Sequence, residues 1–218
     1  MVNLLQIEDW HWEITRNCNQ RCAHCIIGDL EIGEMSTDMA MCMMTRIMTF
    51  GGKRLHITGG EPFVRKDLRL LVRQARTMGI SVNIITNGIL QDVILSFVRD
   101  DLIDQIGVSV DGNETAHDLI RGYGSYCKTV STLQAIIEAG LSVTVYLTIS
   151  SLSINCLGEL ISELIELGVD SFHLNEINRA GRVNTNRYLE ISGLSEKEKI
   201  ENISFQLEPL VEISDLSD

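Results

Sequence analysis

Three cysteines close together in the sequence are the residues best suited to chemistry. Cys18, Cys22 and Cys25 follow a strand-like segment in Cys-Asn-Gln-Arg-Cys-Ala-His-Cys, with three residues between the first pair and two between the second. A tetrahedral metal ion or a [4Fe-4S] cluster takes four ligands. The loop therefore predicts a metal or iron–sulfur site whose fourth ligand comes from elsewhere in the chain or from a small molecule.

A zinc site is the alternative, because His24 could join the three cysteines as a ligand. The run Cys-Ala-His-Cys places neighbouring ligands so close together that a single ion is difficult to coordinate. An open iron–sulfur site is therefore the favoured hypothesis. The remaining cysteines are scattered along helix-like segments and are expected to be packed thiols; they are Cys42, Cys127 and Cys156.

Glycine-rich or polar segments follow three further strand-like segments. They are Thr58-Gly59-Gly60-Glu61-Pro62, Thr86-Asn87-Gly88 and Ser109-Val110-Asp111-Gly112. Tandem glycines let the backbone approach a ligand, and Gly-Gly-Glu-Pro offers accessible carbonyl groups and a carboxylate, which suit an ammonium group. The carboxyl ends of parallel strands open on one side of an α/β barrel, so we expect these segments to converge with the cysteine loop on one site.

The elements that must position these segments are read from the periodicity. Alternating or β-branched residues predict six strands, at 10–15, 54–58, 81–86, 105–110, 141–149 and 171–177. Helical patterns lie between them, at 37–50, 68–75, 90–99, 130–137 and 157–165. Ser36 is the expected N-cap of the first helix, and Gly168 the expected left-handed end of the last. Strict alternation of strand and helix predicts a parallel sheet with right-handed crossovers.

The polarity of the strands distinguishes between the possible architectures. Every second residue near the strand ends is polar, as in Glu13 and Thr15, His56 and Thr58, Ser109 and Asp111, Thr144 and Thr148, and His173 and Asn175. A parallel strand buried on both faces is apolar throughout, so one face of this sheet is expected to line a wet interior. A closed eight-unit barrel needs about 250 residues. We therefore predict an α/β fold of the partial, TIM-like (β/α)6 barrel type, with an antiparallel sheet as the alternative.

Size and charge restrict the class of protein. The chain has 218 residues, of which 44% are hydrophobic, and a net charge of −12, which disfavours nucleic acid as a partner. It lacks a long apolar run and a signal-peptide pattern, so we expect a cytoplasmic protein with no membrane partner. The expected organisation is a lead-in at 1–9, the α/β core at 10–190, and an acidic helix and tail at 191–218, where a further domain could begin.

With Cys-x3-Cys-x2-Cys followed by Gly-Gly-Glu-Pro, the chain resembles the radical S-adenosylmethionine (SAM) enzyme superfamily. The resemblance implies that Cys18, Cys22 and Cys25 hold three irons of a [4Fe-4S] cluster, and that SAM chelates the fourth iron. Electron transfer would then cleave SAM to methionine and a 5′-deoxyadenosyl radical, which abstracts hydrogen from a substrate. The enzyme would be an oxidoreductase, and its cofactors would be the [4Fe-4S] cluster and SAM.

The resemblance also implies which residues contact SAM, and it is strongest to the peptide-modifying and sulfatase-maturing branch, known as SPASM-type. His24 matches a position beside the adenine, and Gly59, Gly60 and Glu61 match the turn that meets the amino group. Other matches hold the ribose and carboxylate or pack on the adenine; they are Ser109, Arg121 and Ile177. The segment Asn178-Arg179-Ala180-Gly181-Arg182 after the last strand also resembles this branch.

The substrate is expected to lie in the polar interior. Candidate contacts there are Glu13, His56, Asn83, Thr144, Tyr146, His173 and Asn175, and none is assigned as a catalytic acid or base. A ribosomal peptide or protein side chain is the favoured substrate, and a small molecule of cofactor biosynthesis is the alternative. The implied electron donor is a flavodoxin or a ferredoxin.

One departure from the branch concerns its C-terminal domain. Members generally continue into a cysteine-rich domain that binds auxiliary clusters, whereas no cysteine follows Cys156 here. The sequence is therefore expected to be either the core of a longer protein or a short relative that works without auxiliary clusters. A non-catalytic iron–sulfur or zinc-binding interaction protein is the alternative from another class, although such a protein would not need Gly59, Gly60, Ser109 and Arg121.

Overall fold

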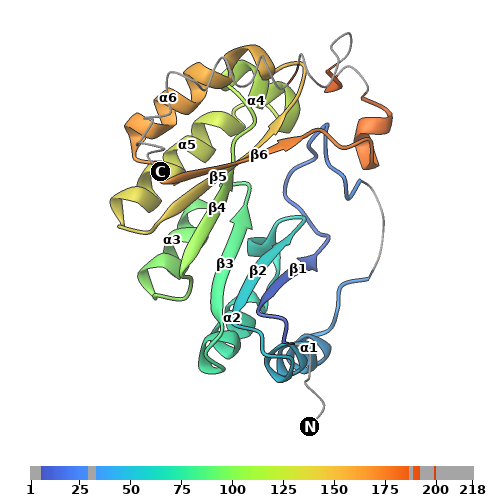
Figure 1. Cartoon of the computed structure of the whole chain (residues 1–218), viewed down its shortest axis with the longest axis vertical. Coiled ribbons are helices and arrows are strands. Elements are labelled where there is room, and N and C mark those ends of the chain that lie inside the picture. Colours follow the sequence, from blue (N-terminus) through green and yellow to red (C-terminus); the bar gives the residue numbers. More distant parts are fainter. Residues whose placement is uncertain (1–5, 29–32, 187–188, 192–198, 200–218) are drawn as a thin grey trace, which may run out of the picture.

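Six parallel strands form one curved sheet in sequence order (Figure 1). A computed structural model describes residues 6–28, 33–186, 189–191 and 199. The strands are β1 (Asp9–Thr15), β2 (Arg54–Gly59), β3 (Ser81–Thr86), β4 (Gln105–Ser109), β5 (Val143–Ile149) and β6 (Ser171–Glu176). Within the described ranges β1 and β6 do not pair, so the barrel stays open. The predicted strands and the partial barrel are confirmed.

Helices cover the outer face of the sheet (Figure 1). They are α1 (Thr37–Thr49), α2 (Leu68–Thr77), α3 (Gln91–Arg99), α4 (Glu114–Arg121), α5 (Ser125–Glu138) and α6 (Leu157–Leu167). Ser36 caps α1 by accepting a hydrogen bond from the Met39 amide, and Gly168 ends α6 with a φ of 103°. Both caps are as predicted. The sequence analysis missed α4, because its residues were interpreted only as a ligand-binding motif.

Three short 3-10 helices occupy turns between the main elements. They are η1 (Pro62–Val64), η2 (Ile154–Cys156) and η3 (Gly181–Asn184). The first follows the Gly-Gly-Glu turn at the end of β2, and the third follows β6. Both therefore lie at the end of the barrel where the strands terminate.

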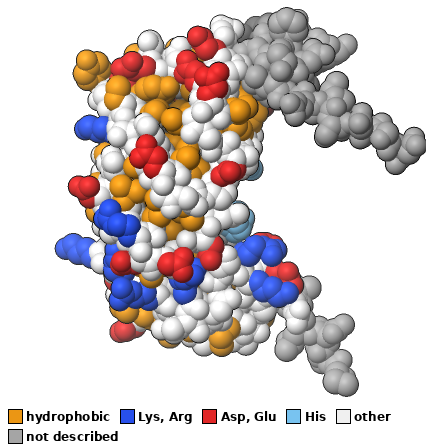
Figure 2. Space-filling model, turned by 90° about the vertical axis from the view of Figure 1, so that its left-hand side faces the viewer, with side chains coloured by type: hydrophobic (Ala, Val, Ile, Leu, Met, Phe, Trp, Pro, Cys, Tyr) orange, Lys and Arg blue, Asp and Glu red, His pale blue; other side chains and the backbone are white. Residues whose placement is uncertain are grey.

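The hydrophobic core lies between the sheet and its helices. Leu55, Ile57, Val143 and Val145 are at most 1% exposed, whereas the intervening strand residues are partly exposed on the other face. This alternation confirms that one face of the sheet is polar. Figure 2 shows the outer helical side, where most of the visible Lys and Arg side chains lie over the lower half. Arg76 of α2 forms an ion pair with Asp104, just before β4, at 2.8 Å.

The expected C-terminal helix and tail at 191–218 fall almost entirely outside the described residues, so this domain boundary stays a prediction. In the part of the chain that the structure describes, no helix has the length and apolar character needed to cross a membrane.

Candidate functional site

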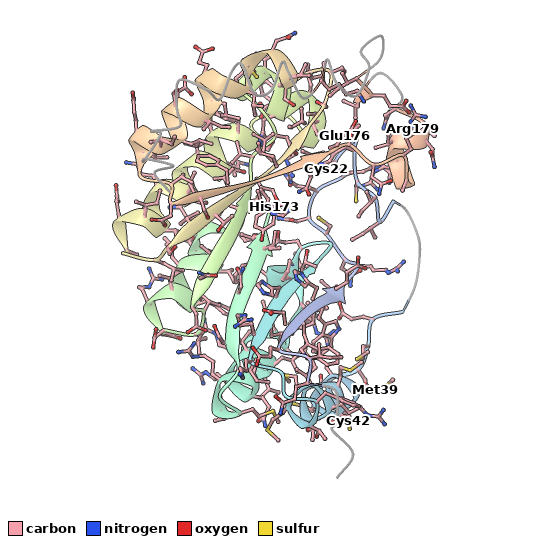
Figure 3. All side chains as sticks on the ribbon, viewed as in Figure 1. Cys22, Met39, Cys42, His173, Glu176 and Arg179 are labelled. Atoms are coloured by element: carbon pink, nitrogen blue, oxygen red, sulfur yellow. The ribbon has the colours of Figure 1, made fainter. Side chains whose placement is uncertain are left out.

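A cavity of about 780 Å³ opens where the strands end. Its wall combines residues that the sequence analysis singled out, namely Cys18, Cys22, His24, Cys25, Gly59, Gly60, Ser109, Arg121, Glu13, Tyr146 and Asn175. The volume is in the range of about 300–1,000 Å³ that small-molecule sites usually occupy. The predicted convergence of the strand ends on one site is therefore observed. Cys22 and Glu176, at the end of β6, both line this cavity, whereas Cys42 lies away from them on α1 (Figure 3).

The tandem glycines hold the start of the cysteine loop. The amide of Gly60 donates to the carbonyl of Thr15 at 2.8 Å, and the amide of Glu61 donates to the carbonyl of Asn17 at 2.9 Å. A Cβ at Gly59 would overlap the Thr15 carbonyl, and one at Gly60 would overlap the Asn17 carbonyl. The sequence analysis expected the glycine backbone to approach a ligand. In the structure it also approaches the backbone of the segment directly before Cys18.

The Glu61 carboxylate does not face the cavity, although its side chain was expected to suit a ligand ammonium group. Glu61 is fully buried, and its carboxylate accepts hydrogen bonds from the Asn87 amide at 2.8 Å and the Thr86 hydroxyl at 2.9 Å. Burial raises the pKa of this carboxyl group, while these donors oppose the rise. The side chain thus ties the end of β2 to the end of β3.

A buried charged network joins two residues of the cavity wall, His24 and Arg121, to Asp111, which lies behind them. Arg121 donates from Nε to Asp111 Oδ2 at 2.5 Å, and His24 Nε2 lies 3.3 Å from the same oxygen. Burial alone would raise the pKa of Asp111, but the charge of Arg121 and the hydrogen bonds to the carboxylate lower it to about 2. Asp111 therefore stays ionised and orients both His24 and Arg121.

Asp111 is the site residue that the sequence analysis did not select. The sequence analysis placed it on the polar face of the sheet, but it is fully buried, and Asn113 is the residue that caps α4. Its other oxygen accepts the Thr148 amide of β5 at 2.8 Å. The sequence feature that could have identified Asp111 is its position in Ser-Val-Asp-Gly, ten residues before Arg121.

The three thiols of the loop line the cavity together. Among the described residues, no three His, Cys, Asp or Glu side chains converge on one ion position. His24 turns its Nε2 toward Asp111, and its Nδ1 is buried without a hydrogen-bond partner. Burial raises the pKa of the thiols of Cys18 and Cys22, so bound iron would have to stabilise their thiolates. Thiolates on one loop, facing a cavity, are the donor set of an iron–sulfur cluster.

A family comparison decides the class of protein. The family model described as "Radical SAM superfamily" matches residues 12–164, from β1 into α6. The chain belongs to the radical SAM superfamily. Radical SAM enzymes bind a [4Fe-4S] cluster and SAM, so both are cofactors of this enzyme, as predicted.

Other radical SAM proteins extend the comparison. Pre-heme d1 synthase of Dinoroseobacter shibae is 33% identical over 183 residues, which is 81% of this chain and 45% of that protein. Mycofactocin maturase MftC of Mycobacterium tuberculosis is 34% identical over 136 residues, 60% of this chain and 34% of the maturase. The chain spans about half the length of pre-heme d1 synthase and about a third of the length of MftC.

Solved structures agree with the radical SAM fold. Streptococcus suis SuiB bound to S-adenosylmethionine superposes with a TM-score of 0.75 at 15% identity, covering 95% of this chain and 49% of SuiB. At this identity the likeness concerns the fold alone.

Several predicted contacts lie outside the cavity wall. Ile177 does not line the cavity, although its neighbours Glu176 and Asn178 do. Besides Ile177 and the buried Glu61, the predicted residues that do not line it are on the polar face nearer the start of the strands; they are His56, Asn83, Thr144 and His173. Residues two apart on a strand share a face but are about 7 Å apart along it. Alternation therefore predicted the correct face for these residues but not their depth.

Proposed function

We propose that the chain is a radical SAM enzyme whose Cys18, Cys22 and Cys25 bind the [4Fe-4S] cluster. The observation that carries this assignment is that all three cysteines line one cavity together with Gly59, Gly60 and the other strand ends. When bound, the cluster supplies the electron that cleaves SAM to methionine and a 5′-deoxyadenosyl radical, which removes hydrogen from the substrate. A flavodoxin or a ferredoxin is the proposed electron donor.

The protein's own residues bind and orient SAM in this proposal. Gly59 and Gly60 bring the backbone of the β2 turn to the cavity wall, where it can meet the ligand's amino group. Ser109 and Arg121, which line the same cavity, would hold the ribose and the carboxylate. Arg121 is held by Asp111, and its side chain is only 9% exposed, so its orientation is set before the ligand binds.

A peptide or protein side chain is the substrate that we favour. The barrel is open between β1 and β6, and the cavity wall beyond the cysteines contains neutral polar groups of Tyr146, Thr148 and Asn175. An open cavity with a polar wall suits an extended chain. SuiB, a neighbour in fold, has been solved with its precursor peptide SuiA, and MftC is a maturase.

A tetrapyrrole is the second candidate. The relatives that support it include pre-heme d1 synthase and an AdoMet-dependent heme synthase of Methanosarcina barkeri, which is 28% identical over 177 residues. Both exceed MftC in the share of this chain that they match. This candidate keeps the same radical chemistry and changes only the molecule in the barrel interior.

Anaerobic reconstitution tests the proposal. The purified chain is loaded with iron and sulfide, and then given SAM and dithionite. Formation of 5′-deoxyadenosine supports the enzyme, whereas its absence with a spectroscopically intact cluster contradicts it. The substrate class is tested by adding either candidate precursor peptides or iron porphyrins and measuring which increases the rate of 5′-deoxyadenosine formation.

A further inference from the structure

The cysteine loop forms few hydrogen bonds within its own backbone, such as the one from the Cys25 amide to the Cys22 carbonyl at 3.3 Å. Residues 16–28 form neither helix nor strand, so most of their carbonyl groups lack the partners that regular structure provides. Buried or half-buried carbonyl groups need hydrogen-bond donors from other parts of the protein. The identity of those donors determines what fixes the shape of the loop.

The Glu61 amide serves the carbonyl of Asn17, and the segment after β6 supplies donors to the part of the loop from Cys22 to Gly28. Arg182 donates from Nε to the carbonyl of Cys22 at 2.8 Å and from Nη1 to the carbonyl of Gly28 at 2.9 Å. Its backbone amide donates to the carbonyl of Cys25 at 3.0 Å. One residue therefore contacts the loop at three points, and two of those points are carbonyl groups of cysteines that line the cavity.

Neighbouring residues support the same contact. Asn186 donates from its side-chain amide to the carbonyl of Ala23 at 2.9 Å. Gly181 has a φ of 59°, and a Cβ there would overlap the carbonyl of Cys25. A glycine is thus needed for Arg182 to come this close to the loop.

We propose that Arg182 is the positioning residue that holds the cysteine loop in its cluster-binding shape. The inference rests on the proposed placement of the cluster on Cys18, Cys22 and Cys25. A guanidinium group has several donors in a fixed plane and can reach two carbonyl groups at once, whereas a lysine ammonium is a point charge on a flexible stem. Groups that orient metal ligands influence how tightly the metal is held, although they do not touch it.

The test uses the full chain with its cluster reconstituted anaerobically. Arg182→Gln and Arg182→Lys are compared with the wild type and with Arg179→Gln. Arg179 is a matched control because it lies three residues earlier, pairs with Glu190 at 3.2 Å, and has a side chain that is 76% exposed. The readouts are the rate of iron release to a chelator and the electron paramagnetic resonance spectrum of the reduced cluster with and without SAM.

Both Arg182 variants are expected to release iron about tenfold to a hundredfold faster than the wild type, with an altered spectrum, and Arg179→Gln is expected to behave as the wild type. Lysine should not rescue, because it keeps the charge but not the two-point geometry. Release rates and spectra equal to the wild type's in both Arg182 variants would overturn the inference, as would an equal effect in Arg179→Gln.

Further measurements distinguish a loss of the Arg182 contacts from a folding defect and from a failure of the proposed function. Circular dichroism of each apoprotein reports whether it folds, and if the Arg182 variants do not, Asn186→Ala removes a single contact and should still accelerate iron release. An unchanged rate in that folded variant would then count against the inference. Wild-type protein that holds a cluster but does not cleave SAM would contradict the proposed function while leaving the role of Arg182 intact.

Discussion

Asp111 forms an ion pair with Arg121 of the cavity wall, with Arg121 Nε 2.5 Å from Asp111 Oδ2 and the carboxylate fully buried. The pair joins the end of β4 to the end of α4. It also places one carboxylate within reach of His24 on the cysteine loop. Three segments of the site therefore depend on one buried charge.

Asp111→Asn should destabilise the protein strongly. Arg121 would keep its charge without its partner, and removing one member of a buried pair costs about 3 kcal/mol or more. Urea denaturation near neutral pH measures the change in the free energy of unfolding. Asp101→Asn is the control, because Asp101 is 92% exposed and pairs loosely with Arg76, so it should leave stability unchanged. Equal stability of the two variants would contradict the prediction.

The free energy of unfolding should decrease as the pH is lowered, because of His117 on α4. Burial and the charge of Arg121 lower the pKa of His117 to about 4 in the folded protein. As the pH drops from about 6.5 to about 4, the unfolded chain binds a proton that the folded protein does not, and the free energy of unfolding decreases by about 3 kcal/mol. In His117→Gln this contribution is removed, so denaturation series across the window should give a shallower slope. A slope as steep as the wild type's would refute the assignment.

Gly60→Ala should disturb the cysteine loop, although Gly60 lies far from that loop in the sequence. The added Cβ would overlap the carbonyl of Asn17 and push the chain directly before Cys18. We expect a loss of about 1–3 kcal/mol in stability and a lower iron content after reconstitution. Gly33→Ala is the matched control, since nothing lies within 4 Å of a Cβ at Gly33. The idea fails if both variants load iron equally.

Glu61→Gln should loosen the joined ends of β2 and β3. The amide nitrogen of glutamine cannot accept a hydrogen bond, so either the Asn87 amide or the Thr86 hydroxyl would lose its acceptor. An unsatisfied buried group costs about 2 kcal/mol, which thermal or urea unfolding can measure. Glu163→Gln on the exposed side of α6 should have no such effect.

Replacement of the loop cysteines should remove the cluster. In Cys22→Ala the site has two thiolates, and we expect loss of the iron–sulfur absorbance together with loss of 5′-deoxyadenosine formation. Cys42→Ala, on exposed Cys42 of α1, should retain both. A cluster that persists in Cys22→Ala would move the ligand assignment to other residues.

Local pattern was sufficient for most of the fold. Ser36 and Gly168 act within one turn of the helices they end, and the polar alternation in β5 needs no knowledge of other strands. The segment of α4 was misinterpreted because it has few apolar positions, so Asn113 was not recognised as a helix cap. The motif around Arg121 also gave a competing explanation. The polar face could be predicted from alternation, but the depth of His56 and His173 along the strands could not.

The sequence by itself determined the chemistry of the site. The spacing of Cys18, Cys22 and Cys25 is local, and it predicts a three-thiolate site whatever the rest of the chain does. Only the tertiary structure decided what holds that site in place. Contacts such as Arg182 with Cys22 and Asp111 with His24 join residues far apart in the sequence. Such contacts form only when the crossovers bring the strand ends together, so no local spacing encodes them.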